Sequence, residues 1–262
     1  MKNLITIALI GIISYLPIIS FAQNNTINYE TIGNQVDQII ELNDLEIVLD
    51  KIVTLRIKVK ENPSHLNRLQ LGVLYYEAAM LSPRTNKETL KLIEKSYTLL
   101  SVLKIDAKTD KALMPYVTSY HASSLAILGY YHESSKLVNQ AFYYFEEAIA
   151  LYGESCYTPY YMRAKVAKHL PIYYSKRSMV KKDLELVIDR FGLNHDYGTD
   201  KAMSYVYYSW ANMFNTKKNR VKAINYLKKS IDLDPKNIAA GREARKVLEK
   251  FNASENKLTV AR

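Results

Sequence analysis

The chain has 262 residues, which is enough to bury a large core in one or two domains. It contains a single cysteine, Cys156, and this excludes a framework of internal disulfides. No histidine or cationic cluster neighbours Cys156 in the sequence, so we do not expect a reactive thiol and assign it to a turn between helices.

The net charge of +10 is concentrated at the C-terminal end. Residues 23–200 contain 21 basic and 21 acidic side chains, whereas residues 201–262 contain 14 basic and 5 acidic ones. A basic end on a neutral body suggests an anionic neighbour such as lipid phosphate, an acidic envelope polymer or an acidic protein face; the alternative is that these lysines only solvate helix faces. The candidate basic patch comprises Lys217, Lys218, Arg220, Lys228, Lys229, Arg242, Arg245 and Lys246.

Residues 1–22 have the pattern of a secretory signal peptide. A short basic start precedes an almost wholly apolar run over 4–19, and Ser20 and Ala22 are the small residues that signal peptidase inspects. We expect cleavage before Gln23 and an exported protein, periplasmic or secreted, with no integral membrane segment left and no nucleic acid as a partner. The alternative is an uncleaved anchor, because residues 4–22 approach the roughly 20 residues that span a bilayer.

Residues 23–64 are predicted to form an N-terminal helical hairpin, with a break at Asn43 and Asp44. Pro63 cannot continue the second helix, and Ser64 is placed to cap the next one. The apolar residues at helical spacing are Ile32, Val36, Ile39 and Ile40, and then Leu45, Val48, Leu49, Ile52, Val53, Leu55, Ile57 and Val59.

Residues 65–200 are predicted to form further hairpins of irregular length. Glycine inside a helix costs about 1 kcal/mol relative to alanine, so Gly72 in the helix 65–80 indicates a close helix crossing. A second helix follows through Leu103, and two more follow Pro115. The segments 160–174 and 178–191 predict another pair, and a loop over 192–199 completes this region.

Residues 201–251 contain the clearest hairpin and a terminal helix. The polar break 215–219 separates the two helices, and Asp234 with Pro235 ends the second one. A helix over 237–251 has the polar outer face of a cap, and residues 252–262 are expected to fray. The apolar positions of the hairpin are Val206, Tyr207, Trp210, Ala211 and Phe214, and then Val221, Ile224, Leu227 and Ile231.

This hairpin resembles the tetratricopeptide repeat, a unit of about 34 residues. Tyr207, Trp210, Ala211 and Phe214 stand where the family has tryptophan, leucine, a small residue and tyrosine, so the first aromatic position departs from the pattern. The second helix matches the family at Ala223, Leu227, Ser230 and the closing Pro235, and partial matches recur at Leu71, Gly72, Tyr75, Leu128, Gly129, Ala141, Phe145 and Ala148. The resemblance implies an all-α, right-handed α-solenoid of stacked antiparallel hairpins, about five in number.

In this family the first helix of each hairpin lines a concave surface that binds peptides or partner segments. Many of the 22 tyrosines occur as doublets, in which one ring enters the core and the next faces a groove. The alternative is that these tyrosines only replace Phe and Leu in packing. By resemblance, the partner-binding residues are Tyr76, Tyr130, Tyr161, Tyr205, Tyr208, Asn212 and Asn215.

No catalytic or metal-binding motif is found in the sequence. His121 and His132 return to one helix face but would lie roughly 16 Å apart at 1.5 Å per residue. We therefore expect a non-enzymatic scaffold without cofactor or metal, which binds an envelope protein or peptide segment through the concave face. Two alternatives stay open: a peripheral binder of an anionic surface through the basic patch, and an enzyme or transport-chain accessory that holds a small ligand in the cavity of the solenoid.

Overall fold

The computed structural model describes residues 29–39, 44–83, 87–191, 199–236 and 240–260, and within these ranges the chain is all-α, as predicted. The predicted signal peptide, most of the loop 192–199 and residues 261–262 lie outside the described residues. The α-helices are α1 (Tyr29–Asp37), α2 (Leu45–Glu61), α3 (His65–Leu81), α4 (Lys87–Ile105), α5 (Met114–Tyr131), α6 (Ser135–Tyr152), α7 (Thr158–His169), α8 (Ser178–Phe191), α9 (Asp200–Met213), α10 (Arg220–Leu233) and α11 (Gly241–Val260). Three 3-10 turns join them: η1 (Lys111–Leu113), η2 (Ile172–Tyr174) and η3 (Lys217–Asn219).

Local chemistry sets the helix ends. The Ser64 hydroxyl accepts the Asn67 amide at 3.2 Å, so the predicted cap of α3 is confirmed. The prediction of one helix over 160–174 is wrong, because α7 ends at His169. Pro171 disfavours helical geometry for the residue before it, and Leu170 is extended, with ψ of 145°.

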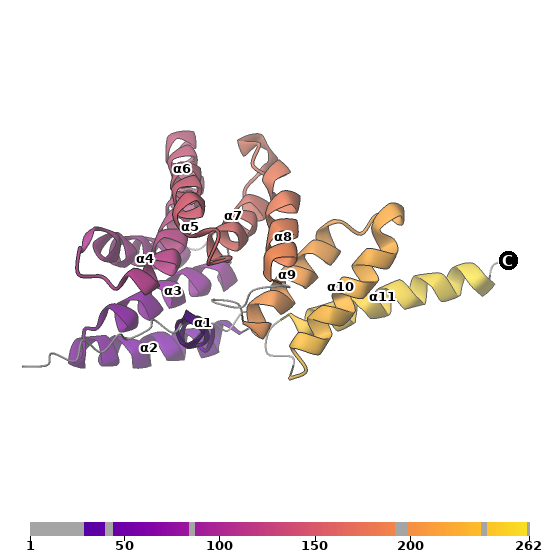
Figure 1. Cartoon of the computed structure of the whole chain (residues 1–262), viewed down its shortest axis with the longest axis horizontal. Helices are drawn as coiled ribbons and strands as arrows, with labels where there is room; N and C mark the ends of the chain where they lie inside the picture. Colours follow the sequence, from indigo (N-terminus) through magenta and orange to yellow (C-terminus); the bar gives the residue numbers. More distant parts are fainter. Residues whose placement is uncertain (1–28, 40–43, 84–86, 192–198, 237–239, 261–262) are drawn as a thin grey trace, which may run out of the picture.

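The helices pack in neighbouring pairs. From α2 to α11 each helix contacts the next, and α3 also contacts α5, α5 contacts α7, and α9 contacts α11. Figure 1 shows the helices following one another along the long axis of the molecule, from α2 to α11. The first helix, α1, has other contacts. It packs against η1, and the backbone carbonyl of its Gln35 accepts a hydrogen bond from the side-chain amide of Gln70, on α3, at 2.9 Å.

Helix α5 lies at the centre of the larger core and is buried on every side. All residues from Pro115 to Gly129 are buried, and α3, α4, α6 and α7 surround the helix. Its small polar side chains bond to the helix itself or to a neighbour, as Ser119 does with the Pro115 carbonyl at 2.6 Å and Ser124 with Ser96 at 2.9 Å. A helix that is apolar all round requires such a cover.

Two glycines allow close helix crossings, as the sequence predicted for Gly72. A Cβ at Gly72 would lie 2.9 Å from Cγ of Leu100, on α4. At Gly129 it would lie 2.8 Å from both Cγ2 and the backbone nitrogen of Val138, on α6. The atoms that a Cβ at Gly129 would meet include the backbone nitrogen of Val138, which cannot rotate away as a side chain can.

The C-terminal hairpin packs as its pattern predicts except at Val221, which is 73% exposed. Trp210 is 1% exposed, and its ring centroid lies 5.7 Å from that of half-buried Phe214. The Ser204 and Ser230 hydroxyls lie 3.0 Å apart where α9 crosses α10, so Ser230 occupies a position that needs a small residue. Helix α11 continues to Val260, beyond Phe251, where the sequence predicted the start of a frayed tail.

We predict that Gly129→Ala destabilises the protein by roughly 1–3 kcal/mol, because overpacking against the α6 backbone outweighs the better helix propensity of alanine. Urea unfolding followed by circular dichroism measures the change. Asn139→Ala, on the exposed side of α6, is the control and should leave the midpoint unchanged. A Gly129→Ala protein at least as stable as the wild type would contradict the close crossing.

Candidate functional site

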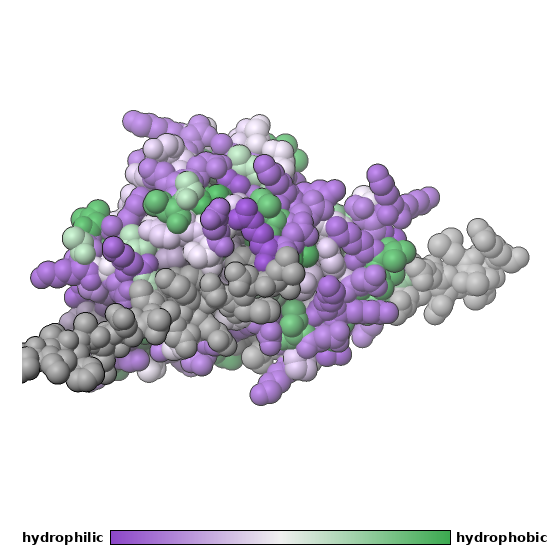
Figure 2. Space-filling model, viewed as in Figure 1, coloured by the Kyte–Doolittle hydropathy of each residue, from purple (hydrophilic) through white to green (hydrophobic). Residues whose placement is uncertain are grey.

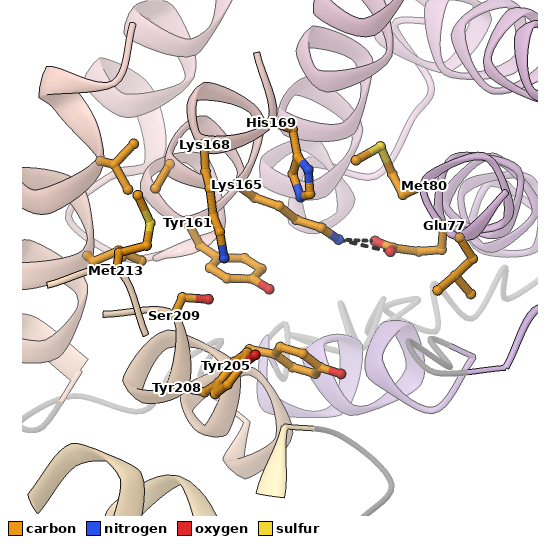
Figure 3. Close-up of a pocket in the computed structure, with 14 residues that line it drawn as sticks. Glu77, Met80, Tyr161, Lys165, Lys168, His169, Tyr205, Tyr208, Ser209 and Met213 are labelled. Atoms are coloured by element: carbon orange, nitrogen blue, oxygen red, sulfur yellow. Dashed lines mark hydrogen bonds and ion pairs between the residues drawn. The ribbon is translucent and has the colours of Figure 1, made fainter. Parts of the chain in front are cut away.

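A pocket of about 210 Å³ opens between α3, α7, α8 and α9, and we call it the central pocket (Figure 3). Side chains three or four positions apart on a helix share one face, and each of these helices presents one such face to the hollow. The lining residues are Glu77, Met80 and Leu81 of α3, Tyr161, Ala164, Lys165, Lys168 and His169 of α7, Val180 and Leu184 of α8, and Tyr205, Tyr208, Ser209 and Met213 of α9.

Two smaller hollows share walls with the central pocket, and we call the three together the groove. One, of about 30 Å³, adds Tyr116, Tyr120 and Tyr157 to the wall and shares Glu77, Tyr161, Lys165 and Tyr205 with the central pocket. The other, of about 70 Å³, shares Met80 and His169 with it and adds Tyr130 and Tyr131. An extended ligand would therefore meet aromatic rings at several successive points.

A buried ion pair crosses the groove from α3 to α7. The Lys165 ammonium lies 2.8 and 2.9 Å from the two carboxylate oxygens of Glu77, as the dashed lines in Figure 3 show. Glu77 is only 1% exposed, and the Tyr120 hydroxyl also donates to it at 3.4 Å. The Lys165 ammonium lies 5.3 Å from the centre of the Tyr76 ring. The Glu77 carboxylate is thus neutralised and hydrogen-bonded by groups of the protein itself.

Lys168 is the one lysine of the central pocket that has no such counter-charge. It is half-buried, and among the described residues no carboxylate lies within ion-pair distance of its ammonium. Burial lowers its pKa from the usual lysine value, because a low dielectric disfavours the charged form. The pocket therefore carries an excess positive charge in its free state.

The structure places four of the seven predicted partner-binding residues on the groove. Tyr161, Tyr205 and Tyr208 line the central pocket, and Tyr130 lines the hollow next to it. One tyrosine doublet has one ring in the core and the next in the groove, as expected: Tyr207 is 7% exposed, and Tyr208 lines the central pocket.

The assignment of Tyr76 to the groove surface is wrong. Its side chain is fully buried and its ring meets that of Tyr120 edge-on at 5.5 Å. Both members of this doublet, Tyr75 and Tyr76, are buried because α2, α4 and α5 all pack on α3. Asn212 and Asn215 are exposed and do not line the three hollows of the groove, so their assignment to a partner-binding face stays a prediction.

The charged residues of the groove were not among the predicted site residues. Lys165 and Lys168 follow Tyr161 at the spacing that keeps side chains on one helix face, and this spacing was the available signal. Glu77 directly follows the misassigned Tyr76 and gave no local sign of its partner, which is 88 positions away.

The predicted basic patch lies on η3, α10 and α11, and hydrophilic side chains dominate this end of the face in Figure 2. Lys217, Lys218 and Lys228 are exposed. Other members bind within the chain: Arg220 lies 3.5 Å from the centre of the Phe251 ring, and Lys246 pairs with Glu243 at 2.8 Å. Only part of the formal charge is therefore left for an anionic partner.

Other side chains that could take part in chemistry are buried or paired within the protein. Cys156 is fully buried in the segment between α6 and α7, and burial raises its pKa to about 12, so its thiol stays protonated. The carboxylates of Asp183 and Glu146 both bind Arg163, with Asp183 at 2.6 and 2.8 Å. Within the described ranges no cluster of three metal-ligating side chains occurs, and no helix has the length and apolar character to cross a membrane.

His121 and His132 do not act together. His132 is exposed at the C-terminal end of α5, whereas His121 is 4% exposed and stacks on Tyr97 with ring centroids 4.9 Å apart. Burial, helped by the nearby Lys104 charge, lowers the pKa of His121 to about 4. The imidazole is therefore a neutral part of the core at neutral pH.

We predict that Glu77→Ala lowers the free energy of unfolding by about 3 kcal/mol, because it leaves the Lys165 ammonium without its buried counter-charge. Urea denaturation at neutral pH gives the value. The matched control is Glu88→Ala, which breaks an exposed pair with Lys91 and should change stability little. Equal effects of the two substitutions would show that the pair across the groove is not structural.

We also predict that His121 makes the protein less stable as the pH falls. Its folded-state pKa of about 4 lies below the unfolded value, so the unfolded chain binds more protons between pH 6.5 and 4. Stability should fall by about 3 kcal/mol over this range relative to His121→Phe, which keeps a ring against Tyr97. Urea unfolding of both proteins at several pH values measures the difference, and parallel pH curves would exclude this role.

The chain matches no protein-family model, no curated protein and no solved structure in the comparisons made with it. The tetratricopeptide resemblance therefore depends on the residues of the chain itself, and any function must be argued from the groove.

Proposed function

We propose that this protein is an exported helical-repeat scaffold of the tetratricopeptide type, which binds an extended segment of another envelope protein in its groove. The observation that carries the proposal is the groove itself, in which α5, α7 and α9 contribute aromatic walls to adjoining hollows and α3 contributes Glu77, Met80 and Leu81. Tyrosine offers a large contact area and a polar hydroxyl at little entropic cost, which suits a recognition surface.

The contacts between helices support a solenoid of stacked hairpins as part of this proposal. The alternate helices α3, α5 and α7 touch in sequence, and α9 touches α11, as first helices do when hairpins stack side by side. Helices α3, α5, α7 and α9, together with α8, line the groove, and in the tetratricopeptide family the first helices of the hairpins line the concave surface. Catalysis is not part of the proposal, because the ionisable groups of the groove are paired or singly placed rather than grouped around a nucleophile.

Export is proposed from the sequence of residues 1–22. An exported scaffold with this groove would meet partners in the periplasm or outside the cell, and it would need no disulfide, since helices from α1 to α11 share a large core and α2 packs on α3 in a second one. A resident cofactor is likewise not part of the proposal.

A second candidate function is binding of an anionic surface through the basic patch, and the exposed Lys217, Lys218 and Lys228 favour it. Binding of this kind weakens as salt rises, because exposed charges are screened beyond about 8 Å at physiological ionic strength. An aromatic groove is much less sensitive to salt, so the two candidates separate in one experiment.

The test is site-specific photo-crosslinking in intact cells, with p-benzoylphenylalanine replacing Tyr208 in the groove, Lys228 in the basic patch, or exposed Asn225 as a control. We expect one discrete protein adduct from position 208, lost when Tyr205→Ala is added and unaffected by salt during cell preparation. Adducts from position 228 that disappear at high salt, with none from position 208, would favour the second candidate. Equal adducts from all three positions would exclude both.

A further inference from the structure

The central pocket has an unequal charge balance. Its charged lining residues are Glu77, Lys165 and Lys168, and the first two neutralise each other at 2.8 and 2.9 Å. Lys168 therefore provides a positive charge that nothing in the described part of the pocket offsets. Figure 3 shows its side chain extending from α7 into the hollow, while the Lys165 side chain turns toward Glu77.

This arrangement favours an anion on physical grounds. A half-buried ammonium loses part of its hydration, and the lowered pKa of Lys168 is the sign of that loss. A carboxylate from a ligand would replace the lost water with a charge-assisted hydrogen bond. Ser209, on the facing helix α9, adds a hydroxyl donor to the same hollow.

Much of the remaining wall is apolar, beside His169 and the rings of Tyr161, Tyr205 and Tyr208. Met80, Leu81, Leu184 and Met213 contribute aliphatic or thioether surface, and Leu184 is 2% exposed. A ligand that satisfies the whole pocket therefore combines one negative group with an adjacent apolar one.

The size of the hollow favours amino-acid side chains over a free small molecule. About 210 Å³ is below the roughly 300–1,000 Å³ of small-molecule sites. The hollows of about 30 and 70 Å³ share its walls, so a chain lying in the groove would pass through the central pocket.

We propose that the central pocket is a specificity site for an acidic side chain followed by an aliphatic one in the bound segment, with Lys168 pairing with the carboxylate and the Met80, Leu184 and Met213 surface receiving the aliphatic group. This inference depends on the proposed function, since it names what the groove selects. Lys168 is the specificity-determining residue, and the Glu77–Lys165 pair holds the wall on which it stands.

The test is a nuclear magnetic resonance titration of the purified protein with labelled methionine methyl groups, because Met80 and Met213 both line the pocket. The probes are a capped hexapeptide with glutamate and leucine at its centre, the same peptide with glutamine in place of glutamate, and free 4-methylpentanoate. We expect the glutamate peptide to shift both methyl signals and to bind at least about tenfold more tightly than the glutamine peptide.

Three variants connect this preference to Lys168. Lys168→Met should remove the difference between the two peptides, Lys168→Arg should keep it, and Lys182→Met, an exposed lysine of α8, should leave it unchanged. If Lys168→Met does not fold, the wild-type peptide comparison and Lys168→Arg still decide the question.

The outcomes separate the two proposals. Equal affinity for the glutamate and glutamine peptides, with both methyl signals shifted, would overturn the acidic preference and leave the groove function standing. No shift with either peptide would overturn the groove function itself. Tighter binding of 4-methylpentanoate than of the glutamate peptide would show that the occupant is a free small carboxylate, which would overturn the assignment to a partner segment.

Discussion

The arrangement of this protein depends on the burial of α5. A helix with no polar face must be covered on all sides, and α3, α4, α6 and α7 supply that cover. Their positions then follow from the need to approach α5 closely, which the small residues Gly129 and Ser124 allow. Because α3 and α7 lie on the same side of α5, charged residues that are distant in sequence become neighbours.

The Glu77–Lys165 pair is the main consequence of that arrangement. Removing two charges from water costs much of the free energy that their attraction returns. Such a pair therefore contributes more to a defined geometry than to net stability. Here it joins α3 to α7 across the groove. The tyrosines on either side keep the pair away from water, and Lys168 is left one helical turn further along α7.

The molecule thus has two distinct charged regions. The central pocket is mostly aromatic and aliphatic; among its described lining residues Lys168 is the lysine without a counter-charge, and this charge is partly withdrawn from water. The basic end, on α10 and α11, is exposed and screened by salt. Selective recognition needs the first kind of environment, whereas a general attraction to anionic surfaces needs only the second.

The sequence by itself determined the all-α class, most helix boundaries, the close crossing at Gly72 and the burial of Trp210, because apolar periodicity, caps and prolines act within a few residues. Its resemblance to the tetratricopeptide repeat also indicated Tyr161, Tyr205 and Tyr208 as lining residues. Only the tertiary structure decided that Tyr76 belongs to the core and that Glu77 pairs with Lys165 across 88 positions. The physical reason is that burial and charge pairing depend on which helices meet around α5, and no local pattern specifies that choice.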